Sequence, residues 1–447
     1  MLQNDKTMTY GSHISALLTL GIPIIIGQLG SVVQGLADTI MVGLYNTTAL
    51  AASGFVNNIM TLILVFALGY SYAITPLVGP LHARNENHEA GKTLKAGLQV
   101  NAILGAALFF LMGTLYFMLD KMGQPEELLP VIRPYYLIIL ISLPFQTLFN
   151  GFKQFFDGVG HTQTPMWIML VSNLLNILGN WLLIYGIGPF PELGLFGAGI
   201  STLFSRIFML AAIYIFFISS SEYKKYHSGF RTKESVGCLR KQLNHLGHPL
   251  ALQMGMECAS FSLCAIMQGW LGSTALAAHQ IMTNISSICF MVYYGIGAAV
   301  AVRVSHFYGT NDLLNVRRSA FTGYLLIFIA GIILSTFTAL LTPQICSLFT
   351  DDIDVQNIVI GMVFPFIIYQ LGDGLQVNFG NSLRGIADVR PLMRYAFICY
   401  ILISLPLSYF FAFTLHGGAA GIWWAFPVAL TTAGLLFLHR FMAKTKQ

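Results

Sequence analysis

The chain has 447 residues, of which 55% are hydrophobic and only 9% are charged, and its mean hydropathy is +0.70. An ordinary soluble domain carries about 25% charged residues, and it needs them because so large an apolar surface would associate in water. The composition therefore excludes a soluble enzyme and indicates a protein whose solvent is lipid. The formal net charge of +5 is no evidence for nucleic-acid binding.

Apolar stretches long enough to cross a membrane recur along the whole chain, separated by turn residues or charges. A transmembrane helix needs about 20 residues, so about twelve spans would use roughly 240 residues. We predict an all-α integral membrane protein with twelve spans. They lie at residues 16–42, 50–81, 96–118, 129–153, 164–188, 196–218, 244–270, 277–305, 319–345, 355–383, 391–414 and 419–441. The first apolar stretch is much longer than that of a secretory signal, so we expect an uncleaved span.

The basic residues predict the orientation of the chain in the membrane. An even number of spans places both termini on one side. Of the 23 Lys and Arg residues, all but Lys121, Arg133 and Arg206 fall in loops on that side or beside the termini. The positive-inside rule then predicts that both termini are cytoplasmic. For a bacterial protein this corresponds to a multi-pass location in the inner (plasma) membrane.

The two halves of the sequence repeat each other at an offset of 226 residues. Pro23 recurs as Pro249, the run TALAASGFVNNI recurs as TALAAHQIMTNI, and Asn85 recurs as Asn311. Six spans in each half give both halves the same direction of insertion, so we expect two six-helix bundles related by a pseudo-two-fold axis along the membrane normal. The predicted domains are an N-lobe at 1–218, a hydrophilic cytoplasmic linker at 219–243 and a C-lobe at 244–447.

Four ionisable residues fall at membrane depth in these spans: Asp38, Arg206, Glu257 and Asp373. Each costs at least about 2.5 to 3.5 kcal/mol near the centre of a transmembrane helix, which favours a functional role. A buried carboxyl is destabilised as an anion, so a proton or a monovalent cation competes for its oxygens. Such a site couples cation entry to the release of a cationic substrate. The residues leave Na⁺ and H⁺ both open, and for Arg206 a structural role remains the alternative.

Polar residues and prolines accompany these charges. Tyr369 precedes Asp373 by one helical turn. Gln280 with Asn284, and Asn176 with Asn180, have the same spacing, and these pairs would either line a wet cavity or hold helices together by hydrogen bonds. Pro23 and Pro249 break equivalent helices near their starts and are hinge candidates. The predicted substrate-cavity residues are Gln280, Asn284, Asn176, Asn180, Gln34 and Tyr293.

Several motifs are absent from the sequence. It contains no nucleotide-binding G-x-x-x-x-G-K-[ST] loop and no H-E-x-x-H metal site. The six cysteines form neither a C-x-x-C motif nor a Cys/His cluster. We therefore expect no enzymatic activity and no cofactor beyond a coupling ion. His279 is the one histidine within a span that we consider for a role beyond packing.

The motifs together resemble those of the MATE (multidrug and toxic compound extrusion) family. They are LADTIMVG around Asp38, HPLALQMGMEC around Glu257, and YQLGDGLQ with NSLRGIADVRP around Asp373, and the resemblance covers essentially the whole chain. It implies twelve helices in two six-helix lobes that form a V-shaped cavity, and export driven by an inward Na⁺ or H⁺ gradient.

Within that family the sequence is similar to the NorM branch. The resemblance implies a cation site at Glu257 and Asp373, which are also the candidate Na⁺ ligands, with Tyr369 beside it and Asp38 as a further coupling acid. The branch named after the DNA-damage-inducible transporters uses a fifth-helix aspartate, where this chain has Asn176 and Asn180. The MGMEC run around Glu257 departs from the bulky aromatics usual in the NorM branch, and this affects the expected substrate preference.

These observations predict a secondary active efflux transporter that exchanges Na⁺ or H⁺ for amphipathic organic cations or related toxic compounds by alternating access. Two alternatives stay open on the same scaffold, a dedicated exporter of one endogenous metabolite and a flippase for lipid-linked precursors. The expected partners are small-molecule substrates and membrane lipid, with no nucleic acid, and the chain is expected to be a monomer.

Overall fold

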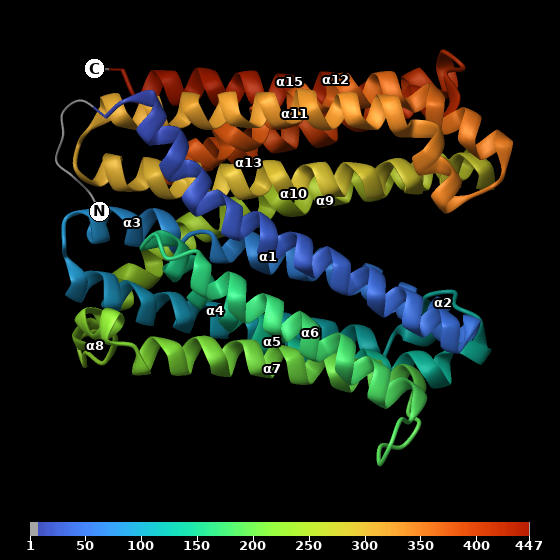
Figure 1. Cartoon of the computed structure of the whole chain (residues 1–447), viewed down its shortest axis with the longest axis horizontal. Coiled ribbons are helices and arrows are strands. Elements are labelled where there is room, and N and C mark those ends of the chain that lie inside the picture. Colours follow the sequence, from blue (N-terminus) through green and yellow to red (C-terminus); the bar gives the residue numbers. More distant parts are fainter. Residues whose placement is uncertain (1–7, 447) are drawn as a thin grey trace. The chain divides into compact units, whose positions relative to one another are not determined.

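A computed structural model describes residues 8–446, and these form helices and connecting turns without any strand. Twelve helical segments are long and apolar enough to span a membrane, as predicted. The second span is two helices joined by a short bend, and the eleventh contains two π-helical stretches, Phe397–Ser404 and Phe410–Thr414. The helices are α1 (Tyr10–Tyr45), α2 (Thr47–Ser71), α3 (Thr75–Ala83), α4 (Asn87–Tyr116), α5 (Leu129–Gly158), α6 (Gln163–Tyr185), α7 (Gly194–Ser219), α8 (Lys224–Phe230), α9 (Gly237–Trp270), α10 (Ser273–Gly309), α11 (Leu313–Phe349), α12 (Ile353–Gly385), α13 (Arg390–Ala396), α14 (Leu405–Tyr409) and α15 (Gly418–Lys444) (Figure 1).

The chain divides into two compact units, and the division differs from the predicted lobes. The N-terminal unit is Ile26–Ala251, and the C-terminal unit is Leu252–Gln447 together with the chain up to Ile25. The start of α1 therefore packs with the second half of the sequence, where the His13 ring bonds Ser319 and Asn315. The start of α9 packs with the first half. Each division between the units comes two residues after a proline, Pro23 in α1 or Pro249 in α9. Both helices continue through their prolines, so the prediction that these prolines break the helices is wrong.

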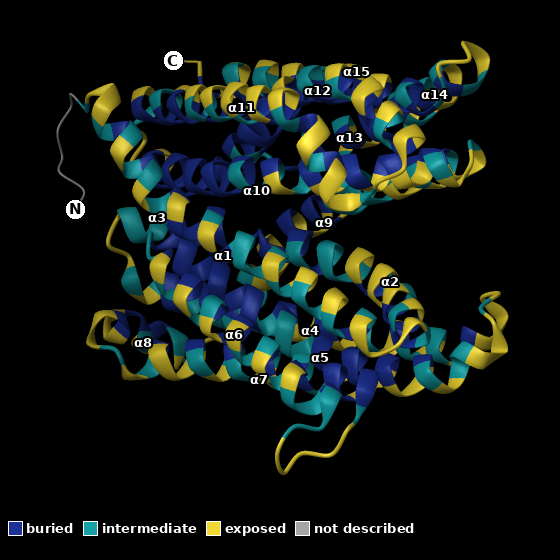
Figure 2. Cartoon of the chain, turned by 45° about the vertical axis from the view of Figure 1, so that its right-hand side comes forward, coloured by how far each residue is buried: buried dark blue, intermediate teal, exposed yellow. Residues whose placement is uncertain are grey.

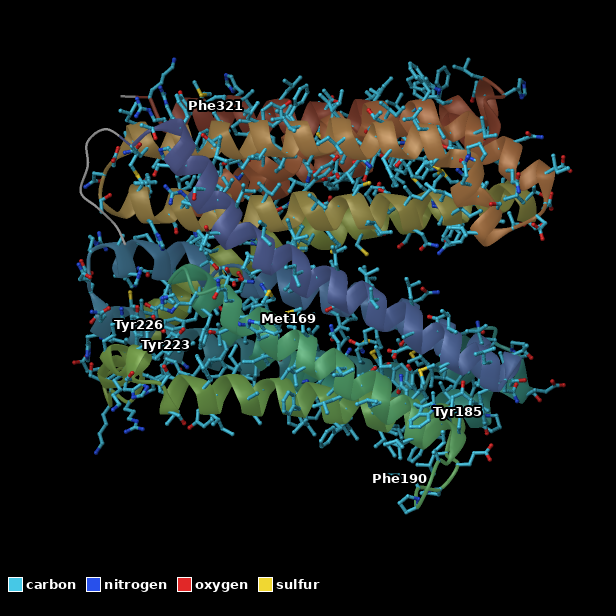
Figure 3. The ribbon with its side chains drawn as sticks, viewed as in Figure 1. Met169, Tyr185, Phe190, Tyr223, Tyr226 and Phe321 are labelled. Carbon is cyan, nitrogen blue, oxygen red and sulfur yellow. The ribbon has the colours of Figure 1, made fainter. Side chains whose placement is uncertain are left out.

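In the N-terminal unit, α5 packs against α2, α4 and α7, and α6 packs along α7 (Figure 1). The predicted linker is not a simple loop, because α8 forms within it and packs on α4. Glycines permit this contact: a Cβ at Gly91 would lie 2.0 Å from the Tyr226 carbonyl oxygen, and one at Gly229 would lie 1.8 Å from the His88 carbonyl oxygen. Tyr223 and Tyr226, labelled in Figure 3, pack here with their ring centroids 6.4 Å apart.

In the C-terminal unit, α12 is surrounded by α10, α11 and α15. Figure 2 colours much of α10 as buried, and 72% of its most apolar window is buried, against 22% for α9. Aromatic side chains fill the space between α12 and α15, among them Phe366, Tyr369 and Trp423. The surroundings of α12 explain why a carboxyl on this helix is removed from water.

Candidate functional site

The first candidate site surrounds Asp38 in the N-terminal unit. Asn180 Nδ2 on α6 donates a hydrogen bond of 2.5 Å to Asp38 Oδ1, and Gln34 Nε2, one turn earlier on α1, lies 3.4 Å from Oδ2. With its amide turned to donate, Asn176 reaches the same Oδ1 at 2.8 Å. Three side-chain amides thus converge on one carboxyl. Asp38 is a well-satisfied hydrogen-bond acceptor in the unit that contains it.

Arg206 on α7 adds a positive charge near this carboxyl. Its NH1 donates a hydrogen bond of 2.7 Å to Ser142 Oγ on α5. Arg206 forms no ion pair within residues 8–446, but it interacts electrostatically with Asp38. Nearby, the Tyr135 hydroxyl donates to Asn57 Oδ1 at 3.2 Å. Arg206 therefore supplies a positive charge in the same unit as Asp38 without forming an ion pair with it.

The second candidate site lies in the C-terminal unit, where Asp373 and Tyr369 share a face of α12 and Glu257 projects from α9. Asp373 is 2% exposed, and its Oδ2 has no hydrogen-bond partner among the described residues. The Glu257 carboxyl interacts electrostatically with Asp373 and lies beside Tyr400 and Gln376. Two carboxyls therefore lie close together, and neither forms an ion pair with a basic residue within residues 8–446.

Tyr369 connects this acidic pair to α10 and α15. Its hydroxyl accepts a hydrogen bond of 3.1 Å from Ser286 Oγ, and its ring packs edge-on against Trp423 with centroids 6.0 Å apart. The Tyr369 hydroxyl is thereby fixed next to Asp373. The oxygens of Glu257, Asp373 and Tyr369 are hard ligands of the kind that suit Na⁺ or a proton.

The remaining predicted residues lie in several environments. Gln280 and Asn284 are exposed on one face of α10. Asn176, Asn180 and Tyr293 are fully buried. The two asparagines donate to Asp38. A substrate-cavity role for the whole set stays a prediction. His279 accepts a hydrogen bond of 3.2 Å from Trp423 Nε1, which gives it a packing role.

Sequence reasoning missed several residues of these sites. Gln376 follows Asp373 by three residues on α12, and this spacing predicts a shared face. Tyr400, Ser286 and Ser142 come from other helices, and no local spacing in the sequence points to them. Residues 8–446 contain no cluster of three or more His, Cys, Asp or Glu side chains suited to a metal ion.

Comparison with known proteins gives consistent matches along the chain. The MatE family profile matches twice, at residues 23–182 and 249–410. The probable multidrug resistance protein NorM of Mannheimia succiniciproducens is 29% identical and covers 98% of this chain and 95% of its own length. The multidrug resistance protein NorM of Vibrio cholerae is also 29% identical, with coverage of 98% and 97%.

Solved structures share the fold at low sequence identity. A MATE transporter of Vibrio cholerae superposes with a TM-score of 0.89 at 17% identity, and 97% of each chain is covered. A transporter of the MOP superfamily from Pyrococcus furiosus has a TM-score of 0.86 at 18% identity, and 99% of each chain is covered. The two profile matches begin at Pro23 and Pro249, which agrees with the internal repeat.

Proposed function

Since the chain belongs to the MATE family of membrane transporters, we propose that it is a secondary active exporter that exchanges Na⁺ or H⁺ for amphipathic organic cations or related toxic compounds. Family membership confirms the resemblance to the NorM branch, the all-helical fold and the expectation of a transporter rather than an enzyme. The coupling ion and the substrate class are our proposal.

The pair of Asp373 and Glu257 carries this proposal. Two carboxyls in an apolar site repel each other when both are ionised, and each loses hydration on burial. Neutralisation by a proton or by a monovalent cation relieves both costs. The unpartnered Asp373 Oδ2 is an oxygen that such a cation can bind.

Exchange follows from competition for the same oxygens. A cationic substrate and the coupling ion neutralise the acidic pair in turn, so the binding of one promotes the release of the other. An inward ion gradient then drives the substrate outward by alternating access. The relatives that carry the name multidrug resistance protein support a broad range of substrates, and the 13% aromatic content is compatible with stacking on flat cations.

The other predicted residues take supporting roles. Asp38 maintains a compensated negative charge in the N-terminal unit, and Tyr369 orients Asp373. Pro23 and Pro249 are hinges because each lies two residues before a division between compact units, and a proline removes one helical hydrogen bond. We propose a monomer in the bacterial inner membrane with both termini in the cytoplasm and lipid around its spans.

Dye efflux from proteoliposomes tests this function. Purified wild-type protein and the Glu257→Gln variant are reconstituted in parallel, and Na⁺ and H⁺ gradients are imposed separately. We expect one gradient to drive the movement of a cationic dye in the wild type and the variant to lose this movement. The Arg394→Gln variant, altered at an exposed residue outside both sites, is the matched control and should retain transport.

Two outcomes contradict the proposal. Gradient-driven efflux that persists in Glu257→Gln would remove the acidic pair from coupling. Folded wild-type protein that moves none of several unrelated cationic dyes under either gradient would contradict the proposed substrate class.

A further inference from the structure

A cavity of about 480 Å³ lies within the N-terminal unit, away from Asp38. It is bounded by α2, α4 and the beginning of α9, and its two long walls differ in character. The α4 wall is apolar and includes Val100, Ile103 and Ala107. The α9 wall carries Arg240 and Lys241, followed by polar side chains one and two turns later. The cavity is therefore amphipathic, with a basic side facing an apolar one.

The basic wall has no acidic partner in the part of the chain that the structure describes. Arg240 and Lys241 are exposed and form no ion pair within residues 8–446, and no Asp or Glu lines the cavity. The nearby Glu234 is already paired with Lys92, at an N···O distance of 2.5 Å. Two positive charges thus face the cavity without an acidic partner among the described residues.

The other polar residues that line the cavity hold α9 against α2. The Tyr70 hydroxyl donates a hydrogen bond to Asn244 Oδ1, and the Tyr70 ring packs edge-on against the His248 ring with centroids 5.4 Å apart. Gly247 makes this approach possible, since a Cβ there would lie 2.9 Å from the Tyr70 ring. The cavity is therefore supported by packed helices and does not depend on a surface loop.

The helix length locates the cavity relative to the membrane. α9 has 34 residues, which at about 1.5 Å per residue gives about 51 Å, whereas the hydrocarbon core is about 30 Å thick. Its far end, near Trp270, is apolar, so the excess length lies at the beginning of the helix. Arg240 and Lys241 are accordingly at the headgroup level. The helix begins at Gly237, which also lines the cavity, and the partial positive charge of a helix N-terminus favours an anion there.

The internal repeat provides a comparison within the same chain. At the offset of 226 residues, α4 corresponds to α11, and Ile103 and Ala107 correspond to Ile329 and Ile333. The apolar wall is thus present in both halves. Arg240 and Lys241 correspond to Ile14 and Ser15, so the basic wall is present in one half only. The common scaffold accounts for the apolar wall but gives no reason for the charges.

We propose that this cavity binds an anionic phospholipid of the leaflet next to the basic loops. The phosphate lies against Arg240, Lys241 and the beginning of α9, and an acyl chain follows the apolar face of α4 at Ile103 and Ala107. Basic pockets between transmembrane helices recognise anionic headgroups in this way. The bound lipid links the beginning of α9 to α4 and thereby stabilises the segment just before Pro249. This inference is independent of the coupling ion and of the exported substrate.

Lipid titration of the full-length chain tests the proposal. Delipidated protein in detergent is titrated with dioleoyl phosphatidylglycerol, with dioleoyl phosphatidylcholine and with inorganic phosphate, and bound lipid is counted by native mass spectrometry. We compare the wild type with the double variant Arg240→Gln/Lys241→Gln and with the charge-matched control Arg390→Gln/Arg394→Gln in the C-terminal unit. Thermal unfolding verifies that every variant is folded.

The proposal predicts a saturable phosphatidylglycerol site that the Arg240→Gln/Lys241→Gln variant weakens about 30-fold, because each basic residue near an anionic lipid contributes about 1 kcal/mol. The control should change binding by less than about twofold. Ala107→Trp, which fills the apolar side and keeps every charge, should also weaken binding, since the acyl chain loses its place. Phosphatidylcholine should bind weakly, and inorganic phosphate should not compete at millimolar concentration.

Three results would overturn the proposal. Equal loss in both double variants would indicate general attraction to basic residues. Competition by inorganic phosphate, with binding intact in Ala107→Trp, would indicate a soluble anion site instead of a lipid site. Unchanged phosphatidylglycerol binding in Arg240→Gln/Lys241→Gln would remove the site altogether.

Discussion

The two acidic sites of this chain lie on repeated scaffolds and differ in how their charge is satisfied. In the N-terminal unit, Asp38 accepts hydrogen bonds from Asn180 and Gln34 and lies near the Arg206 guanidinium. In the C-terminal unit, Asp373 keeps one buried oxygen without a partner and is close to a second carboxyl, Glu257. We therefore propose that the acidic pair, and not Asp38, is the site that takes up an ion.

The repeat indicates that this difference evolved on top of a common fold. At the offset of 226 residues, Asp38 corresponds to Cys264 and Glu257 corresponds to Ser31. The backbone is closely matched, since Asn85 and Asn311 are equivalent and adopt φ values of 60° and 58°. Equivalent helices therefore carry different chemistry. On the proposed function, this difference fits ion exchange in the C-terminal unit and a fixed charge in the N-terminal unit.

The largest effect is expected at the acidic pair. Asp373→Asn and Glu257→Gln each remove a negative charge and keep the side-chain shape, so the site no longer requires a cation. We expect gradient-driven efflux to fall at least about tenfold, equivalent to about 1.4 kcal/mol, with membrane insertion unchanged. Initial rates in proteoliposomes measure this effect. Wild-type efflux rates in both variants would contradict a coupling role for the acidic pair.

A smaller loss is expected for Asp38→Asn. The amide preserves most of the geometry around Asn180, but Arg206 loses its compensating charge. We expect a roughly threefold lower rate, equivalent to about 0.7 kcal/mol, and an unchanged dependence on the driving ion. The same efflux assay, run over a range of ion gradients, measures both quantities. Complete loss of ion dependence would contradict a fixed-charge role.

The two prolines provide a symmetric test of the hinge proposal. Pro23→Ala and Pro249→Ala restore a backbone N–H inside α1 and α9 and stiffen each helix. We expect slower transport in both variants, by similar factors, with no loss of thermal stability. The control is Pro343→Ala, at a proline inside α11 far from either division of the chain. If Pro343→Ala slows transport as much as Pro23→Ala and Pro249→Ala, the proposed hinge role of those two prolines is wrong.

The smallest effect concerns pH and a histidine between two spans of the N-terminal unit. Burial lowers the pKa of His161 below its ordinary value of 6.5, although the Glu222 carboxylate opposes this shift. At His161 the unfolded chain then binds a proton more readily than the folded chain. The free energy of unfolding is therefore highest above pH 6.5, where His161 is neutral in both states, and it decreases as the pH falls from 6.5 towards the lower pKa of the folded state. Thermal unfolding of wild type and His161→Gln between pH 7.5 and pH 5 measures this, and the variant should show the weaker pH dependence.

The local features of the chain were predictable, and the long-range ones were not. A spacing of four residues predicts that Tyr369 and Asp373 share a face of α12 and that Asn176 and Asn180 lie one turn apart, and both asparagine amides do reach Asp38 Oδ1. The contacts of Tyr400 with Glu257 and of Ser286 with Tyr369 depend on packing between distant helices. Hydropathy also failed to predict α8, because the close contacts that accommodate it, of Gly91 with Tyr226 and of Gly229 with His88, join segments far apart in the sequence.

The start of α1 packs with the C-terminal unit and the start of α9 packs with the N-terminal unit. The sequence pattern did not predict this either, because it too depends on contacts between distant segments. The apolar pattern of these helices is continuous across Pro23 and Pro249, so it predicts two helices but not their partners. The partners are chosen by side chains such as His13, which bonds Ser319 on α11, and Asn244, which bonds Tyr70 on α2.

Displacement of a bound cationic dye by the coupling ion tests the central claim most directly. Dye bound to purified wild type, Asp373→Asn and Asp38→Asn in nanodiscs is measured by fluorescence anisotropy while Na⁺ is raised at constant pH, and in a second series while pH is lowered without Na⁺. The account predicts that one of these ions displaces the dye from wild type and from Asp38→Asn but fails to do so in Asp373→Asn. Displacement retained in Asp373→Asn and lost in Asp38→Asn would contradict it.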